Sequence, residues 1–358
     1  MWKKILVGCG LIVALLSGVV ASGVVWSSKF NLSEAELSHL RATTASQIDY
    51  LQSIPDKSRG KILAVVTSVE KLGDTGKITG YELTELSRAY WVFLVNGFDV
   101  DVASPQGGEP YALLDAEDMG PFDYAFLNDA HAQQKIKNTL KLDKVTAADY
   151  EAIYFVGGKG AMFDFPDNPE VHRLVKEFEQ QDKVIAAVCH GPAALVNAKS
   201  ADGKWLVANK KVSAFTNTEE LLLIPNAETI FPFLLQTRLE QRGAHFIAGP
   251  DYLNQISVDG KLVTGQNPWS VWSLAEAVIQ QLGYEPSPRE LTPEERSVKL
   301  LTIFQDKGLD HAENIAKHSG DEYSGWLVLM HAMVAFMKAE PLNGVALMML
   351  ADEVRPRT

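Results

Sequence analysis

The stretch AVCHGP, at residues 187–192, decides the fold of this chain. It follows an apolar run that starts at Val184, and Pro192 suits the first position of a following helix. Small residues around Cys189 are typical of a nucleophile elbow, a sharp strand-to-helix turn that holds its central side chain in the open. We expect Cys189 to be reactive, because the N-terminus of the following helix favours a thiolate over a thiol. The alternative is a buried structural cysteine, since free cysteine is among the most buried residue types.

Short apolar runs alternate with helical patterns from Lys61 onward. Strands are predicted at residues 62–66, 99–103, 153–156 and 184–188, and helices at residues 83–96, 169–181 and 192–198. Single helices between strands imply parallel βαβ units with right-handed crossovers, so we expect an α/β fold with a doubly wound, mostly parallel sheet. Active residues then gather at the carboxyl ends of the strands, where Cys189 and Gly157-Gly158 both fall.

The pattern along the chain predicts several parts with different characters. They are a hydrophobic signal peptide or transmembrane anchor at residues 1–28, a helical spacer at 29–60, an α/β catalytic domain at 61–284, and a helical C-terminal extension at 285–358. Ser33 and Glu36 predict a capping box at the start of the spacer helix. The apolar run from Trp326 to Met337 is too short to cross a membrane. We expect the C-terminal helices to pack on the domain or on a partner subunit, and a peripheral membrane contact is the alternative.

The N-terminus predicts export or anchoring. Lys3 and Lys4 precede an almost charge-free run from Ile5 to Trp26, and about 20 apolar residues are needed to cross a bilayer. A signal peptide cut near Ala21 and an uncleaved anchor that holds the membrane through residues 5–26 are both consistent with this run. The predicted localisation is the cell envelope, with the domain anchored in the inner membrane and facing the periplasm, or secreted to the periplasm after cleavage.

Charge and cysteine content narrow the function classes. The formal net charge of -12 argues against nucleic acid as a partner and against electrostatic docking on anionic lipid, because both reward a surplus of Lys and Arg. The only cysteines are Cys9 and Cys189, so the part of the chain after the hydrophobic segment has one thiol and no internal disulfide. In an oxidising compartment this favours a reactive role for Cys189 over a structural one.

Further segments accompany the cysteine in a fixed order. They are Thr79-Gly80 followed by Glu85, then GFDV at residues 97–100, ASPQGG at 103–108, GGKGAMFD at 157–164, AFTNTEE at 214–220 and TGQNP at 264–268. Together with CHGP at residues 189–192 they resemble the ThiJ/PfpI superfamily, in the branch that contains glyoxalase III enzymes and heat-shock chaperones. The resemblance covers Lys61 to about Leu282. It implies a class I glutamine-amidotransferase-like fold, which is a flavodoxin-like sandwich with a nucleophile elbow.

The resemblance also assigns candidate site residues. It makes Cys189 the nucleophile, His190 its triad neighbour and Glu220 the acid that orients the histidine, with Glu219 left open one register step away. Glu85 matches the carboxylate that lies beside the cysteine in the family. Without the resemblance, its interpretation is an exposed glutamate on a helix. The remaining candidates are the oxyanion and substrate-binding residues Gly158, Lys159 and Gly160. Lys159 stands where a histidine is often found, so a solvated loop lysine is its alternative interpretation.

The function implied by the resemblance is that of a cysteine-dependent glyoxalase III or deglycase. Such an enzyme converts an α-oxoaldehyde, for example methylglyoxal, to a hydroxy acid without glutathione, and the chemistry requires no metal and no organic cofactor. The expected partners are a small carbonyl substrate and a second copy of the chain in a homodimer. Two alternatives stay open: a PfpI-like peptidase or amidase, and a holdase chaperone or stress protein whose C-terminal helices bind unfolded clients.

Overall fold

The computed structural model describes residue 30 and residues 32–355. The described chain divides into two compact units. One unit runs from Leu40 to Leu291, and the other combines the described residues before Leu40 with those from Thr292 onward. The predictions for residues 1–28 lie outside the described residues.

A seven-stranded sheet forms the centre of the Leu40–Leu291 unit, in the order β10-β11-β7-β6-β1-β3-β5. The strands are β1 (Lys61–Val65), β3 (Asp99–Ser104), β5 (Leu140–Lys141), β6 (Ala152–Phe155), β7 (Val184–Val188), β10 (Ile256–Asp259) and β11 (Leu262–Gly265). Neighbouring strands pair in parallel except β10 and β11, which are antiparallel. The order β3-β1-β6-β7-β11 is that of a flavodoxin-like sheet, so the predicted doubly wound fold is confirmed.

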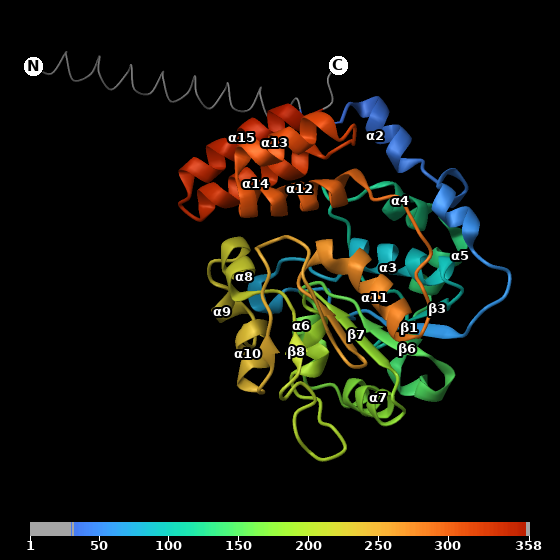
Figure 1. Ribbon diagram of the computed structural model, residues 1–358. Helices are drawn as coiled ribbons and strands as arrows, with labels where there is room; N and C mark the ends of the chain where they lie inside the picture. The colour runs from blue at the N-terminus through green and yellow to red at the C-terminus, as the bar shows by residue number, and fades with distance from the viewer. Residues whose placement is uncertain (1–29, 31, 356–358) are drawn as a thin grey trace, which may run out of the picture. The chain divides into compact units, whose positions relative to one another are not determined.

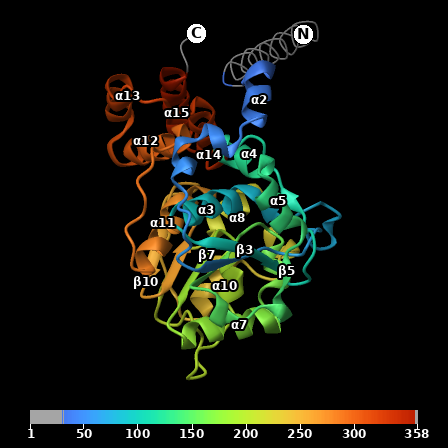
Figure 2. The same cartoon turned by 90° about the vertical axis from the view of Figure 1, so that its right-hand side faces the viewer.

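The sheet is covered on both faces, as successive side chains of its central strand require. Ile62 and Ala64 of β1 belong to a core cluster that includes residues of α3 (Leu83–Val95) and α11 (Val271–Gln281). Leu63 and Val65 belong to a second cluster with α7 (Pro169–Gln180). Figures 1 and 2 show α3 and α11 on one face of the sheet and α7 on the other.

Shorter elements surround this sheet. They are β2 (Tyr81–Glu82), β4 (Ala112–Leu113), α4 (Pro121–Asn128), α5 (Ala130–Lys137), α6 (Ala161–Asp164), β8 (Lys211–Val212), α8 (Asn217–Leu223), α9 (Ala227–Ile230), α10 (Leu235–Gln241) and β9 (His245–Phe246). The 3₁₀ segments are η2 (Ala45–Gln47), η3 (Asp49–Ser53), η4 (Gly73–Thr75), η5 (Leu142–Lys144), η6 (Ala147–Asp149), η7 (Gly191–Leu195) and η8 (Pro268–Ser270).

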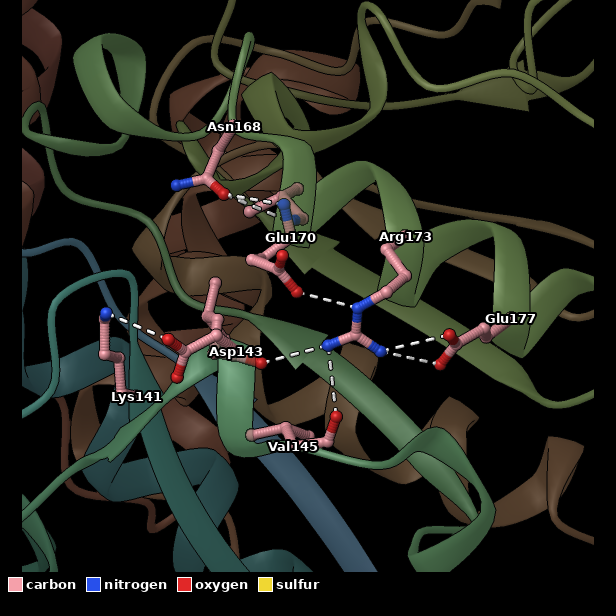
Figure 3. A network of polar contacts seen from close by, with 9 residues as sticks. Lys141, Asp143, Val145, Asn168, Glu170, Arg173 and Glu177 are labelled. Atoms are coloured by element: carbon pink, nitrogen blue, oxygen red, sulfur yellow. Dashed lines mark hydrogen bonds and ion pairs between the residues drawn. The ribbon is translucent and has the colours of Figure 1, made fainter.

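Arg173 fastens α7 to the segment that follows β5 (Figure 3). Its guanidinium donates to the carbonyl oxygens of Leu142 and Val145 at 3.0 and 3.1 Å. On its own helix it also bonds to Glu170 at 2.7 Å and to Glu177 at 2.9 Å. One side chain therefore satisfies two loop carbonyls and sets the position of α7.

The second unit is helical. Its helices are α2 (Glu34–Arg41), α12 (Pro293–Lys307), α13 (Leu309–His318), α14 (Gly325–Met337) and α15 (Pro341–Val354), of which α2 ends in the sheet-containing unit. The capping box predicted for α2 is present, since Glu36 accepts from the backbone N–H of Ser33 at 2.7 Å. Across residues 32–355, none of the helices has both the length and the apolar character that a bilayer crossing requires.

Candidate active site

The elbow lies between β7 and η7, and Cys189 sits at its apex with a φ of 56°. This left-handed conformation is strained for a residue with a side chain, and the surrounding backbone holds it in place. The N–H of Cys189 donates to the carbonyl of Gly265 at 3.0 Å, and its own carbonyl accepts from Phe215 at 3.0 Å. A Cβ on Gly191 would come within 2.2 Å of the carbonyl oxygen of Phe155, so the turn needs glycine there.

His190 connects the thiol to a carboxylate. Its Nδ1 atom lies 3.3 Å from Sγ of Cys189, and its Nε2 atom lies 2.6 Å from Oε2 of Glu220 at the start of α8. The imidazole is buried and packs on the ring of Phe215, with 4.6 Å between ring centroids. The arrangement is therefore a Cys-His-Glu series in which the carboxylate fixes the orientation of the ring.

Glu219 and Glu220 have different surroundings, although both are buried. Glu219 closes a capping box with Thr216, and its Oε1 atom accepts from the backbone N–H of Tyr252 at 2.6 Å. It also accepts from the side chains of Gln266 at 3.0 Å and Asn267 at 2.9 Å. Glu219 thus ties three loops to α8, while Glu220 faces the histidine.

Glu85 is a fully buried side chain of α3, and it lies against the thiol of Cys189. Its Oε2 atom accepts from the N–H of Gly157 at 2.7 Å. A Cβ on Gly157 would come within 2.5 Å of that oxygen and 2.9 Å of Cβ of Cys189, so glycine lets the carboxyl and the cysteine approach the same loop. The structure therefore does not support the alternative of an exposed helix glutamate.

Burial dominates the electrostatics of this pair. It raises the pKa of the Glu85 carboxyl well above its ordinary value, and the charge of Glu82 adds to the effect. Burial also raises the pKa of the Cys189 thiol, with the Glu85 carboxylate as the next cause. Two anions side by side in a desolvated site are unfavourable, so the pair keeps a proton at neutral pH.

We expected the N-terminus of a helix to stabilise the Cys189 thiolate, but burial instead raises the pKa of the thiol. The reason lies in the segment that follows the cysteine. In place of the predicted helix at residues 192–198, the segment after Cys189 is the short 3₁₀ helix η7. Such a segment has a small dipole, and desolvation of the buried sulfur outweighs it.

The glycine loop after β6 approaches the site from a neighbouring strand. Gly158 has a φ of 99°, and a Cβ there would come within 2.5 Å of the carbonyl oxygen of Gly80. Lys159 is partly exposed, and its charge lowers the pKa of the Cys189 thiol against the effect of burial. Gly160 instead faces Thr67, whose Cγ2 atom would lie 2.7 Å from an added Cβ. The structure therefore brings Lys159 near the thiol and turns Gly160 toward the end of β1.

Two neighbours of the site were not singled out in the sequence. Glu82 precedes α3, and burial raises its pKa to about 7. Its position at the N-cap, three residues before Glu85, is the sequence signal that could have found it. Tyr252 has a φ of 55°, and its hydroxyl donates to the carbonyl of Glu219 at 2.6 Å. Nothing in the sequence around Tyr252 marks it, because it lies on a loop far along the chain.

The chain matches the DJ-1/PfpI family over residues 77–281, which include each candidate site residue. It belongs to this family. A glutathione-independent glyoxalase of Schizosaccharomyces pombe is 32% identical over 217 residues, which are 58% of this chain and 90% of that relative. Glyoxalase 3 of Candida albicans is 29% identical over 232 residues, covering 61% of this chain and 97% of that relative. The predicted superfamily and its glyoxalase III branch are confirmed.

Two solved structures agree with the fold. The rapid encystment protein of Francisella tularensis aligns with a TM-score of 0.59 and 33% identity, over 62% of this chain and 99% of that protein. The crystal structure of glyoxalase III from Candida albicans aligns with a TM-score of 0.56 and 26% identity, over 62% of this chain and 97% of that protein.

The predicted localisation needs correction. An inner-membrane anchor with a periplasmic domain, or a secreted periplasmic protein, was expected from residues 5–26, which lie outside the described residues. In the part of the chain that the structure describes, no helix can cross a membrane. The chain also matches glutathione-independent glyoxalases over nearly their whole length. The similarity to these glyoxalases contradicts the predicted envelope localisation, and the predicted membrane contact through residues 5–26 is unsupported and lies outside the described residues.

Proposed function

We propose that this protein is a glutathione-independent glyoxalase that converts small α-oxoaldehydes, such as methylglyoxal, to hydroxy acids. The observation that supports this most is the buried carboxyl of Glu85 against the thiol of Cys189. Hydrolysis of a peptide by a Cys-His-Glu series needs no second carboxyl beside the sulfur, and neither does client binding by a chaperone. Proton transfer between adjacent carbons does need one.

The reaction starts with the sulfur. The thiolate of Cys189 attacks the aldehyde carbon and forms a carbon–sulfur bond, and the aldehyde oxygen takes a proton to give a hemithioacetal. His190 is the proposed carrier of that proton: its ring lies 3.3 Å from the sulfur, so it can take the thiol proton of Cys189 and pass it to the aldehyde oxygen, while Glu220 fixes the orientation of the ring. Backbone N–H groups near Gly158 and after Cys189 stabilise the developing oxyanion.

Glu85 then moves a proton between carbons. As a carboxylate it removes the hydrogen from the former aldehyde carbon while the ketone oxygen takes a proton, which gives an enediol. It then returns its proton to the adjacent carbon, while the hydroxyl on the former aldehyde carbon loses one. The product is a thioester of the hydroxy acid on Cys189. Water attacks this thioester, the carbon–sulfur bond breaks, and the thiol takes back a proton. The net reaction adds one water to methylglyoxal, so it needs no oxidant or reductant.

The geometry also supports a small substrate. Only 5% of Cys189 is exposed, which disfavours the approach of a polypeptide backbone more than that of a compact aldehyde. Lys159 is the proposed contact for the carboxylate that the reaction creates, and Gly160 supports its loop. A cationic side chain near the thiol attracts a product that carries a negative charge.

The test is lactate formation from methylglyoxal in the absence of glutathione. We expect wild-type protein to form lactate, Cys189→Ala to fall to the buffer background, and Glu85→Gln to lose about a hundredfold or more in kcat. Lys176→Ala is the control, because that side chain is exposed on α7 and is none of the candidate site residues. A wild type no faster than Cys189→Ala would reject the proposal.

A further inference from the structure

Glu82 approaches the Cys189–Glu85 pair, although the reaction above gives it no task. It is the last residue of β2 and the N-cap of α3, and Glu85 is the third residue of that helix, so the two glutamates belong to the same strand-to-helix junction. The N–H of Glu82 donates to the carbonyl of Gly157 at 3.2 Å, and the N–H of Gly157 donates to Oε2 of Glu85 at 2.7 Å. The two glutamates therefore hold the same glycine.

Lys159 enters the same place from the loop after β6. The preceding residue, Gly158, packs so closely on β2 that an added Cβ would lie 2.7 Å from the backbone nitrogen of Glu82. Both Glu82 and Lys159 are partly exposed, whereas Glu85 and Cys189 are buried. One negative and one positive residue next to this glycine loop thus reach solvent, while the pair does not.

The two charges act on the buried pair in opposite directions. The Glu82 carboxylate raises the pKa of both Glu85 and Cys189, after burial has already done so. The Lys159 ammonium lowers the pKa of Cys189 and that of Glu82. Because both act in a desolvated site, their effect on the pair is larger than between exposed groups.

From this geometry we infer that Glu82 and Lys159 form an opposed charge pair that sets how readily the Cys189–Glu85 pair loses its proton. Glu82 touches no reacting atom and acts through Glu85, so it is a positioning residue. The inference rests on the proposed function for its catalytic meaning. A carboxylate made more basic by Glu82 is better able to remove a proton from carbon, while Lys159 keeps the thiolate accessible.

Other charged and titratable groups face these residues from the neighbouring elements. They are Arg88 on α3, Asp115 and Asp118 on the segment before α4, Tyr154 on β6, His190 after β7, Glu220 on α8, and Tyr252 on the loop before β10. Each remains unchanged when Glu82 or Lys159 is substituted. A difference between the two variants therefore reports the two charges.

The experiment is the pH dependence of Cys189 alkylation by iodoacetamide in the full chain. Mass spectrometry of the tryptic peptide that contains Cys189 separates it from Cys9. Glu82→Gln should move the alkylation midpoint to lower pH and raise the rate below the midpoint by about threefold to tenfold, because a tenfold change corresponds to one pKa unit. Lys159→Met should move the midpoint to higher pH and lower the rate by a similar factor.

Charge-preserving and remote variants complete the design. Glu82→Asp and Lys159→Arg should retain the wild-type midpoint, as should Asp202→Asn and Lys204→Met, which change an exposed ion pair. Midpoints of Glu82→Gln and Lys159→Met that coincide with wild type, or that move in the same direction, would overturn the inference. If Glu82→Gln does not fold, Lys159→Met decides by itself. Alkylation needs no substrate, so absence of lactate formation would reject the proposed function and leave this result readable.

Discussion

The adjacent acids Glu219 and Glu220 differ in what each one contacts. Glu220 makes its contact with the imidazole of His190, while Glu219 accepts hydrogen bonds from three other segments. A glutamine in place of Glu219 would turn an amide N–H₂ toward donors, whereas a glutamine in place of Glu220 can still accept from the ring. The two substitutions should therefore separate stability from chemistry.

We expect Glu220→Gln to lower kcat for methylglyoxal by about tenfold or more, because the ring of His190 loses the carboxylate that orients it. Its melting temperature should stay close to that of wild type. Glu219→Gln should instead reduce the free energy of unfolding by about 1–3 kcal/mol, since buried donors lose their acceptor. Thermal unfolding and initial rates on the same preparations check both. Equal effects of the two variants on kcat would contradict the assignment.

The sequence left this choice open for a physical reason. Both acids occupy the first turn of α8, where either is favoured by the helix dipole. Which of them reaches His190 depends on how α8 packs against β7, and that is a tertiary property. Cys189 and His190 could be predicted because the elbow pattern is local. The burial of Glu85 could not, since its spacing alone fits an exposed helix.

At the scale of elements, the start of α7 follows a local sequence signal, and the difference between the predicted spacer helix and α2 has a local cause. Pro169 begins α7 as the sequence predicts, with Asn168 as its cap at 2.9 Å from the N–H of Glu170. The spacer is a shorter helix than expected, α2, followed by 3₁₀ turns. Thr43 and Thr44 favour caps and turns over helix interiors, and a capping box at Thr44 opens η2.

Arg173 offers a prediction at this scale. Its guanidinium is the donor to the carbonyls of Leu142 and Val145, so Arg173→Ala leaves both carbonyls to water and loosens α7. We expect the free energy of unfolding to fall by about 1–3 kcal/mol with kcat unchanged. Lys176→Ala on the same helix should change it by less than about 0.5 kcal/mol. Urea unfolding measures both, and equal stabilities would show that the network in Figure 3 contributes nothing.

At the scale of the whole molecule, the site is built from segments that are distant in sequence but meet at the carboxyl ends of the parallel strands. The alternation of strands and helices was sufficient to predict that the site lies at these strand ends. The division of the chain into parts and the expected homodimer stay predictions. The described chain separates into a sheet-containing unit and a helical unit, and the candidate site residues belong to the former.

Buried carboxyls give the molecule a pH dependence. Burial raises the pKa of Glu82 to about 7, and of Asp118 and Asp164 to about 6. A carboxyl with a raised folded-state pKa binds its proton more tightly when folded, so its stabilising effect is complete below the unfolded-state value. That effect is lost as pH rises through the folded-state value. These groups therefore favour the folded state near pH 4 more than near pH 7.

We expect the free energy of unfolding to decrease between about pH 5 and pH 7 in wild type, and to decrease less in Glu82→Gln. Urea titrations at several pH values in this window measure the slope. Glu285→Gln, at an exposed position, is the matched control and should keep the wild-type slope. A slope in Glu82→Gln that equals or exceeds that of wild type would contradict the raised pKa.

The left-handed backbone at Cys189 has a consequence over evolutionary time. Glycine adopts a φ of 56° without strain, and asparagine tolerates it better than most residues do. The elbow thus has a strained cysteine at its apex, where glycine would fit the backbone better, because the proposed reaction needs the sulfur atom. In a descendant that no longer needed the reaction, drift at this position should run first toward glycine or asparagine. The identity of this one residue would then record whether the lineage still performs the chemistry.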